Sequence, residues 1–132
     1  MKRTTKKKQS TRYRSKFEED VAKILNGRFK YEESKFNYTS NHVYTVDFDD
    51  GTVYLECKGR FRFGEARKYL DITRCNPDIR LEFVFYNPNT PMPGAKRRKD
   101  GTKHSMAEWA TMHGFNYYTL GSLPEAYTRG KS

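Results

Sequence analysis

The sequence has few of the residues that build zinc sites and no segment that spans a membrane. Its two cysteines, Cys57 and Cys75, and its three histidines do not form a group with zinc-binding spacing. No run of 18 apolar residues occurs, so no membrane span is expected. The basic N-terminus lacks the apolar stretch of a secretory signal. Cys57 alternates with Glu56 and Lys58 and is therefore expected to point into the apolar layer as a small buried hydrophobe. This use of cysteine fits a reducing compartment, so we expect a cytoplasmic protein.

Acidic residues are missing from the N-terminal segment. Residues 1–16 contain eight Lys or Arg and no Asp or Glu, whereas the remainder holds 18 basic and 16 acidic residues. The net charge of +10 therefore comes mostly from residues 1–16. We expect residues 1–12 to be a disordered basic arm that binds nucleic acid by neutralising phosphates. A solubilising tail or a general polyanion anchor is the alternative. The candidate DNA-binding residues here are Lys2, Arg3, Lys6, Lys7, Lys8, Arg12, Arg14 and Lys16.

Aromatic residues make up 15% of the chain and must form much of the core, because aliphatic residues are few. Hydrophobic spacing and capping residues predict three helices, the first with a capping box between Ser15 and Glu18. The order of elements indicates one α/β domain with a mixed sheet flanked by helices, over residues 13–120, followed by a C-terminal tail, 121–132. The expected helices are 15–25, 65–75 and 105–112, and the expected strands are 28–38, 43–58 as a hairpin, 79–86 and 115–118.

The strongest hairpin signal is Asp50-Gly51, which lies between two runs of β-forming residues. If these two residues form the turn, Phe48 pairs with Val53. Because side chains alternate along a strand, the hairpin then has one apolar and one polar face. The apolar face carries Phe48, Val53, Leu55 and Cys57, and the polar face carries Asp47, Tyr54, Glu56 and Lys58.

Asp47, Glu56 and Lys58 on that polar face are the candidate catalytic residues. The two carboxylates become diagonal neighbours, roughly 7–8 Å apart at Cα, close enough to share a hard cation such as Mg²⁺. Bound Mg²⁺ polarises a phosphoryl oxygen, and an adjacent lysine stabilises developing negative charge. The pattern therefore indicates metal-assisted phosphodiester hydrolysis. A solvated hairpin face with an ordinary charge pair is the alternative, because so short a pattern also occurs by chance.

A second basic run lies in the loop at residues 87–104. It can form another phosphate-binding patch or a solvated loop, and composition alone favours neither. The three histidines are too dispersed for a catalytic triad, although His104 lies beside this basic loop and could contact phosphate. The candidate DNA-binding residues of the loop are Lys96, Arg97, Arg98 and Lys99.

Four stretches of sequence carry a more specific signal over roughly residues 12–120. They are, in order, Tyr13–Glu18 with the helix that follows, Ser40–Phe48, Leu55–Gly59 and Ser105–Phe115. In that order they resemble the phage endonuclease I family of Holliday-junction resolvases, within the PD-(D/E)xK nuclease superfamily. Residues 66–70 and 76–80 also fall where that family has similar residues.

The resemblance implies a restriction-endonuclease-like core and an intertwined homodimer with two active sites. It implies that Asp47 and Glu56 bind metal, that Lys58 is the superfamily lysine, and that Glu18 completes the site formed by the partner subunit. Hydrolysis would use two Mg²⁺ or Mn²⁺ ions per site and leave a 5′-phosphate. The basic arm would contact branched DNA, in the host cytoplasm if the protein is phage-encoded.

Two departures from the family pattern are visible. Val46 stands where the family usually has proline before the aspartate, and the segment 36–43, where the bridge between subunits should fall, is shorter than expected. Proline there shapes the backbone and binds no metal, so the ligand set is unchanged. The resemblance implies a structure-selective endodeoxyribonuclease that resolves four-way and branched DNA. The alternatives are a sequence-specific or homing-type endonuclease on the same scaffold and a non-catalytic DNA-binding protein.

Overall fold

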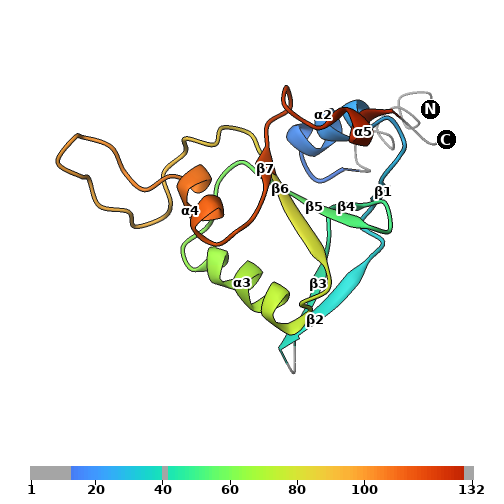
Figure 1. Ribbon diagram of the computed structural model, residues 1–132, viewed down its shortest axis with the longest axis horizontal. Helices are drawn as coiled ribbons and strands as arrows, with labels where there is room; N and C mark the ends of the chain where they lie inside the picture. Colours follow the sequence, from blue (N-terminus) through green and yellow to red (C-terminus); the bar gives the residue numbers. More distant parts are fainter. Residues whose placement is uncertain (1–12, 40–41, 130–132) are drawn as a thin grey trace, which may run out of the picture.

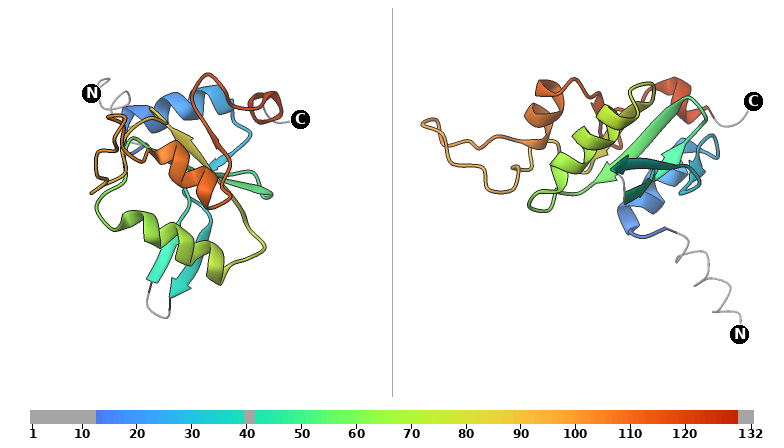
Figure 2. Two further views of the ribbon diagram at one scale, coloured as in Figure 1. Left: turned by 60° about the vertical axis from the view of Figure 1, so that its left-hand side comes forward. Right: turned by 90° about the horizontal axis from the view of Figure 1, so that it is seen from below.

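A computed structural model describes residues 13–39 and 42–129 of the chain. In these residues a five-stranded sheet is flanked by helices, and a separate two-stranded hairpin lies beside helix α3 (Figures 1 and 2). None of the described helices is long and apolar enough to cross a membrane. The elements are α2 (Lys16–Leu25), β1 (Lys30–Tyr31), β2 (Lys35–Thr39), β3 (His42–Thr45), β4 (Phe48–Asp49), β5 (Val53–Lys58), α3 (Glu65–Cys75), β6 (Arg80–Phe85), α4 (Met106–Met112), β7 (Tyr117–Tyr118) and α5 (Glu125–Thr128).

The five-stranded sheet has the order β1-β4-β5-β6-β7 and mixes two kinds of pairing. Strands β1, β4 and β5 are antiparallel neighbours, whereas β5, β6 and β7 run parallel. Parallel neighbours need a crossover connection, and α3 supplies it between β5 and β6. The predicted mixed α/β architecture is therefore confirmed. The expected restriction-endonuclease-like core and the intertwined homodimer stay predictions.

Two apolar clusters cover the two faces of this sheet. One contains the inward residues of α3 and α4, among them Tyr69 and Trp109, packed on Phe83 of β6. The other contains Val21 of α2 and Tyr127 of α5. The predicted apolar face of the hairpin belongs to the second cluster, where Phe48, Val53, Leu55 and Cys57 are all buried. Helices therefore cover both faces of the central strands. Polar side chains at the end of β5 face the cleft described below.

The hairpin register differs from the predicted one. Phe48 pairs with Leu55, so the reversal is centred one residue later than expected. The N–H of Asp50 donates to the carbonyl of Val53 at 3.2 Å, which leaves Gly51 and Thr52 between them. The Asp50 side chain accepts hydrogen bonds from the N–H groups of Thr52 and Val53 at 2.9 and 2.8 Å, and these bonds hold the turn. Because each residue's partner changes by two positions, every side chain stays on its face.

Two further expectations were wrong. The strand expected at residues 28–38 is split into β1 and β2, which belong to different sheets. The break falls at Glu32, whose left-handed φ of 51° turns the chain between them. The C-terminal tail expected from residue 121 contains α5, and its Tyr127 is only 7% exposed. The packed part of the described chain therefore continues past residue 120.

Candidate active site

The predicted polar face of β5 opens into a cleft of about 750 Å³. Its walls come from the start of α2, the turn after β1, strand β3, the end of β5 and the start of α3. The cleft brings together all four predicted catalytic residues and several that the sequence did not indicate. Its charged lining residues are Arg14, Glu18, Glu32, Asp47, Glu56, Lys58, Arg60, Arg62, Glu65 and Lys68.

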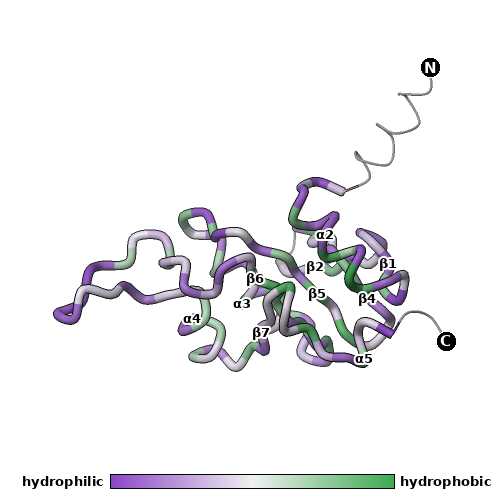
Figure 3. The backbone as a smooth tube through the Cα atoms, turned by 90° about the horizontal axis from the view of Figure 1, so that it is seen from above, coloured by the Kyte–Doolittle hydropathy of each residue, from purple (hydrophilic) through white to green (hydrophobic). Residues whose placement is uncertain are grey.

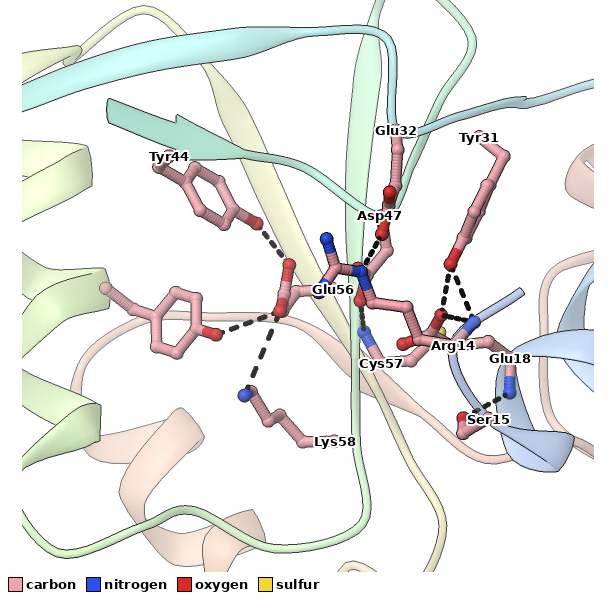
Figure 4. A network of polar contacts seen from close by, with 11 residues as sticks. Arg14, Ser15, Glu18, Tyr31, Glu32, Tyr44, Asp47, Glu56, Cys57 and Lys58 are labelled. Carbon is pink, nitrogen blue, oxygen red and sulfur yellow. Dashed lines mark hydrogen bonds and ion pairs between the residues drawn. The ribbon is translucent and has the colours of Figure 1, made fainter. Parts of the chain in front are cut away.

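Three carboxylates meet in one half of the cleft (Figure 4). Carboxylate oxygens of Glu18, Glu32 and Asp47 all lie within 4.8 Å of one another. Asp47 is only 6% exposed, and its Oδ2 accepts a hydrogen bond from the N–H of Cys57 at 2.9 Å. That bond ties the bend before β4 to β5. Three acids so close together repel one another unless a cation or a proton intervenes.

Glu18 reaches the cluster because the predicted capping box is only half formed. Ser15 Oγ accepts from the N–H of Glu18 at 3.0 Å, as a helix cap does. The Glu18 carboxylate does not return this bond. It accepts instead from the hydroxyl of Tyr31 at 2.7 Å and from the N–H of Arg14 at 3.3 Å. Glu18 therefore lies beside Asp47 of its own chain, whereas the resemblance implied a place in the partner's site.

Glu32 is the member of the cluster that sequence reasoning missed. Its left-handed backbone is uncommon for a residue other than glycine. The N–H of Glu32 donates to the carbonyl of Asp47 at 2.9 Å, which fixes the turn against the site. Its side chain accepts from Arg14 Nε at 2.6 Å. The sequence shows only two adjacent acids within the expected strand 28–38, a pattern that does not distinguish Glu32 from Glu33.

Glu56 lies in the other half of the cleft and faces two tyrosines (Figure 4). It accepts hydrogen bonds from the hydroxyl of Tyr44 and, at 2.9 Å, from that of Tyr69. The nearest cation is Lys58, whose Nζ lies 4.0 Å from Glu56 Oε2. Tyr44 belongs to β3 and Tyr69 to α3, so the two are far apart in the sequence. No local sequence pattern therefore indicates that they meet at Glu56.

Lys58 is held by an acid that the sequence did not indicate. Its Nζ donates to Glu65, which begins α3, and the ammonium also lies 5.4 Å from the centre of the Tyr69 ring. The Glu65 carboxylate accepts a second bond from the N–H of Arg62 at 2.9 Å. Burial opposes ionisation of Glu65, but these bonds from Arg62 and Lys58 prevail and lower its pKa. The lysine is thus fixed between two carboxylates.

The electrostatics of the cleft favour a bound cation. Burial, with the nearby carboxylates of Glu56 and Glu18, raises the pKa of Asp47 to about 9. Burial also raises the pKa of Glu56, although Tyr44 and Lys58 favour its charged form. The raised pKa of Asp47 means that its carboxyl group competes for a proton, which a hard divalent ion displaces. The donor set Glu18, Glu32 and Asp47 therefore fits Mg²⁺ or Mn²⁺, both of which prefer carboxylate oxygens.

Val46 lies directly before Asp47, at the position where proline was expected. It is fully buried, and its N–H donates to the carbonyl of Ser34 at 3.0 Å. A proline has no N–H and cannot make this bond. The sequence thus replaces a rigid residue with a hydrogen bond that holds the segment before Asp47 in place.

The predicted DNA-binding residues lie in three places. The candidates at positions 2–12 fall outside the described residues. Arg14 lines the cleft, and Lys16 pairs with Asp20 on the surface of α2 at 3.1 Å. The other four lie on the loop between β6 and α4, which projects from the domain and is hydrophilic at its tip (Figures 1 and 3). In this loop Arg98 forms two 3.0 Å bonds with Glu108, whereas Lys96 and Lys99 are exposed.

Clustered carboxylates beside a lysine in an open cleft are typical of nucleases that use divalent cations. Comparison with known families agrees with this class. The family model for phage endonuclease I matches residues 1–131. The chain therefore belongs to the phage endonuclease I family and is a nuclease whose substrate is DNA. No curated protein matches the chain.

Proposed function

We propose that this protein is a divalent-metal-dependent, structure-selective endodeoxyribonuclease that cleaves four-way junctions and other branched DNA. The observation that carries the proposal is the meeting of Glu18, Glu32 and Asp47 carboxylates within 4.8 Å, in a chain of a nuclease family. Glu56 and Lys58 lie in the same cleft. This combination supports hydrolysis more strongly than DNA binding alone, because binding needs no buried acids.

Each group has a role in the proposed hydrolysis. Glu18, Asp47 and Glu56 would hold Mg²⁺ or Mn²⁺, two ions per site, with Glu32 as a further ligand. Such ions would supply polarisation of a phosphoryl oxygen and activation of water. Lys58, fixed by its bond to Glu65, donates to the oxygen on which negative charge develops.

DNA contacts surround this chemistry. Arg14 is 75% exposed at its side chain and pairs with Glu32, so it can exchange that partner for a phosphate at the cleft mouth. The basic arm and the residues Lys96 and Lys99 extend the cationic surface. In the proposed homodimer, the spacing of two such sites selects branched DNA over continuous duplex.

The direct test is cleavage of three DNAs in Mg²⁺: a four-way junction, a linear duplex of the same sequences and a plasmid of unrelated sequence. The proposal predicts preferential cutting of the junction and no cutting in EDTA. One preferred site in the linear duplex would instead favour a sequence-specific endonuclease. Binding without cutting in Mg²⁺ and Mn²⁺ would favour a non-catalytic DNA-binding protein.

The arm has a separate test in the salt dependence of binding. Deleting residues 2–12 removes six Lys or Arg. If each contacts a phosphate, the slope of log K against log salt becomes shallower by up to about 5. Junction affinity would be measured between 50 and 200 mM salt for both chains, roughly the range over which phosphate contacts dominate. An unchanged slope would mean that the arm does not contact phosphates.

A further inference from the structure

Tyr86, an exposed aromatic residue, lines the wall of the candidate active-site cleft. Tyr86 is 67% exposed, although the residue before it, Phe85, is fully buried at the end of β6. Its N–H donates to the carbonyl of Lys58 at 3.0 Å. This bond continues the parallel pairing of β5 and β6, so the backbone of Tyr86 is fixed relative to Lys58.

Phe17 supports the Tyr86 ring from α2. The two rings meet edge to face, with centroids 5.5 Å apart and planes at 86°. Phe17 directly precedes Glu18, and both aromatic residues line the same cleft as the carboxylates. In an edge-to-face contact the edge of one ring covers one face of the other, so this contact holds the Tyr86 ring and leaves at least one of its faces available for a further aromatic partner. The pair is thus a supported aromatic surface beside the candidate active site.

Charge around the cleft indicates which ligand meets this surface. Arg14, Arg60 and Arg62 line the cleft, and all three are exposed. They attract a polyanion, and a nucleic-acid strand passing them presents its bases to the walls. An apolar peptide would gain nothing from these cations or from the buried acids.

We propose that Phe17 and Tyr86 form a nucleobase-binding subsite in which the Tyr86 ring stacks on the base of a nucleotide next to the scissile phosphate. This inference rests on the proposed nuclease function and deepens it. A base within continuous duplex is already stacked on both faces, so only a nucleotide released from its neighbours can occupy the subsite. Tyr86 therefore contributes to the preference for branched DNA, where such nucleotides occur at the branch point.

Photocrosslinking tests the contact itself. The cleavage position in a four-way junction is mapped first, and 5-iodouracil then replaces the base on either side of it in turn. Complexes form in a Glu56→Gln background, which keeps the DNA intact. The proposal predicts a crosslink that mass spectrometry assigns to Tyr86 for one of the two positions, and its loss in Tyr86→Leu. Crosslinks at other residues only would overturn the proposal.

Cleavage kinetics test the energetic role with matched variants. Aromatic stacking on one base is lost in Tyr86→Leu, which should raise KM for the junction roughly 5- to 150-fold while kcat stays near the wild-type value. Tyr86→Phe keeps the ring and should restore KM. Phe63→Leu is the control, because Phe63 is 86% exposed and does not line the cleft. Wild-type KM in Tyr86→Leu would overturn the subsite while leaving the nuclease proposal intact. A wild-type protein that neither binds nor cuts any DNA would overturn both.

Discussion

Glu56 on β5 and Glu82 on β6 are buried glutamates on neighbouring parallel strands, 6% and 1% exposed. Glu82 accepts bonds from Tyr127 at 2.6 Å, Arg80 at 2.8 Å and Asn116 at 3.1 Å. Burial alone would raise the pKa of Glu82, but these three bonds outweigh it and lower the pKa. The carboxylate is stably ionised and joins α5, β6 and the segment before β7.

Glu56 also accepts hydrogen bonds, but these bonds compensate less of the cost of burying its charge. Two tyrosine hydroxyls bond to it, while its nearest cation, Lys58, lies 4.0 Å away and is bound to Glu65. Burial therefore prevails, and the pKa of Glu56 is raised. The acid neighbour Asp47 adds to the excess of negative charge.

The difference teaches how to distinguish a structural acid from a functional one in this fold. A buried carboxylate whose ionisation the protein fully supports contributes to stability. One whose ionisation is left incompletely supported needs a ligand from outside, and such groups gather at functional sites. By this criterion Glu82 is structural, whereas Asp47 and Glu56 belong to the active site.

The sharpest way to break the comparison is to replace Glu56 and Glu82, one at a time, by neutral glutamine. We expect Glu56→Gln to lower kcat for junction cleavage by at least about 10²–10³-fold, because it removes a charged group from the proposed metal site. Junction binding should stay nearly intact, since the cationic residues are unchanged. In Glu82→Gln, which is the matched control, kcat should stay near the wild-type value.

Single-turnover cleavage and a binding titration on the same junction would measure both effects. Full activity in Glu56→Gln would remove Glu56 from the site. A comparable loss of kcat in Glu82→Gln, with the fold intact, would remove the distinction between the two acids.

The second prediction concerns stability. Glu82→Gln should lower the free energy of unfolding by about 1–3 kcal/mol, because a buried charged acceptor with three donors becomes a neutral amide. Little of this loss comes from the ion pair, since the Arg80 side chain is 56% exposed and screened by water. Urea denaturation in EDTA would measure the change. Glu56→Gln should be clearly less destabilising in the same buffer, and the reverse order would contradict the account.

The third prediction concerns the pH dependence of metal-free stability. The pKa of Asp47 is raised to about 9 from its unfolded value of 3.8. Between pH 3.8 and about 9 the folded protein keeps a proton on Asp47 that the unfolded chain has lost. The contribution of Asp47 to the free energy of unfolding is therefore complete below pH 3.8 and is lost as the pH rises through about 9. The lowered pKa of Glu82 acts with the opposite sign, and its contribution disappears in acid, below the unfolded value of 4.5.

Thermal melts in EDTA and in Mg²⁺ would separate the two contributions. Because a cation binds the ionised carboxylates, the gain in melting temperature from Mg²⁺ should widen as pH rises from 6 to 9, roughly the span below the raised pKa. In Asp47→Asn this gain should disappear, whereas Glu82→Gln should keep it. A gain that is the same at every pH would mean that protons and the cation do not compete at Asp47.

Much of the fold could be predicted because its signals are local. Helix α3 has the predicted bounds, and α4 begins after the predicted cap, Ser105. The two faces of the hairpin were also predicted, since alternation depends only on neighbours along the strand. The register of the hairpin could not be predicted, because the side chains of Asp49 and Asp50 bond to N–H groups of the turn and the reversal falls one residue later.

The candidate site was predictable only in part. Asp47, Glu56 and Lys58 follow from a short pattern, and family resemblance adds Glu18. Glu32 depends on a backbone kink and on its bond to the Asp47 carbonyl, which no local pattern reveals. Three further residues orient Glu56 and Lys58, namely Tyr44, Glu65 and Tyr69. They come from other elements of the fold, and no motif in the sequence marks them.

The central claim is that the buried acids of the cleft hold a divalent cation, and anomalous diffraction from crystals soaked in Mn²⁺ tests it most directly. The account predicts a strong anomalous peak within coordination distance of Asp47 and Glu18, about 2.0–2.3 Å from their oxygens, and none beside Glu82. Crystals of Asp47→Asn should lose that peak. A peak confined to surface carboxylates would contradict the claim. So would a cleft that contains no ion at high Mn²⁺ and keeps the Arg14–Glu32 ion pair unchanged.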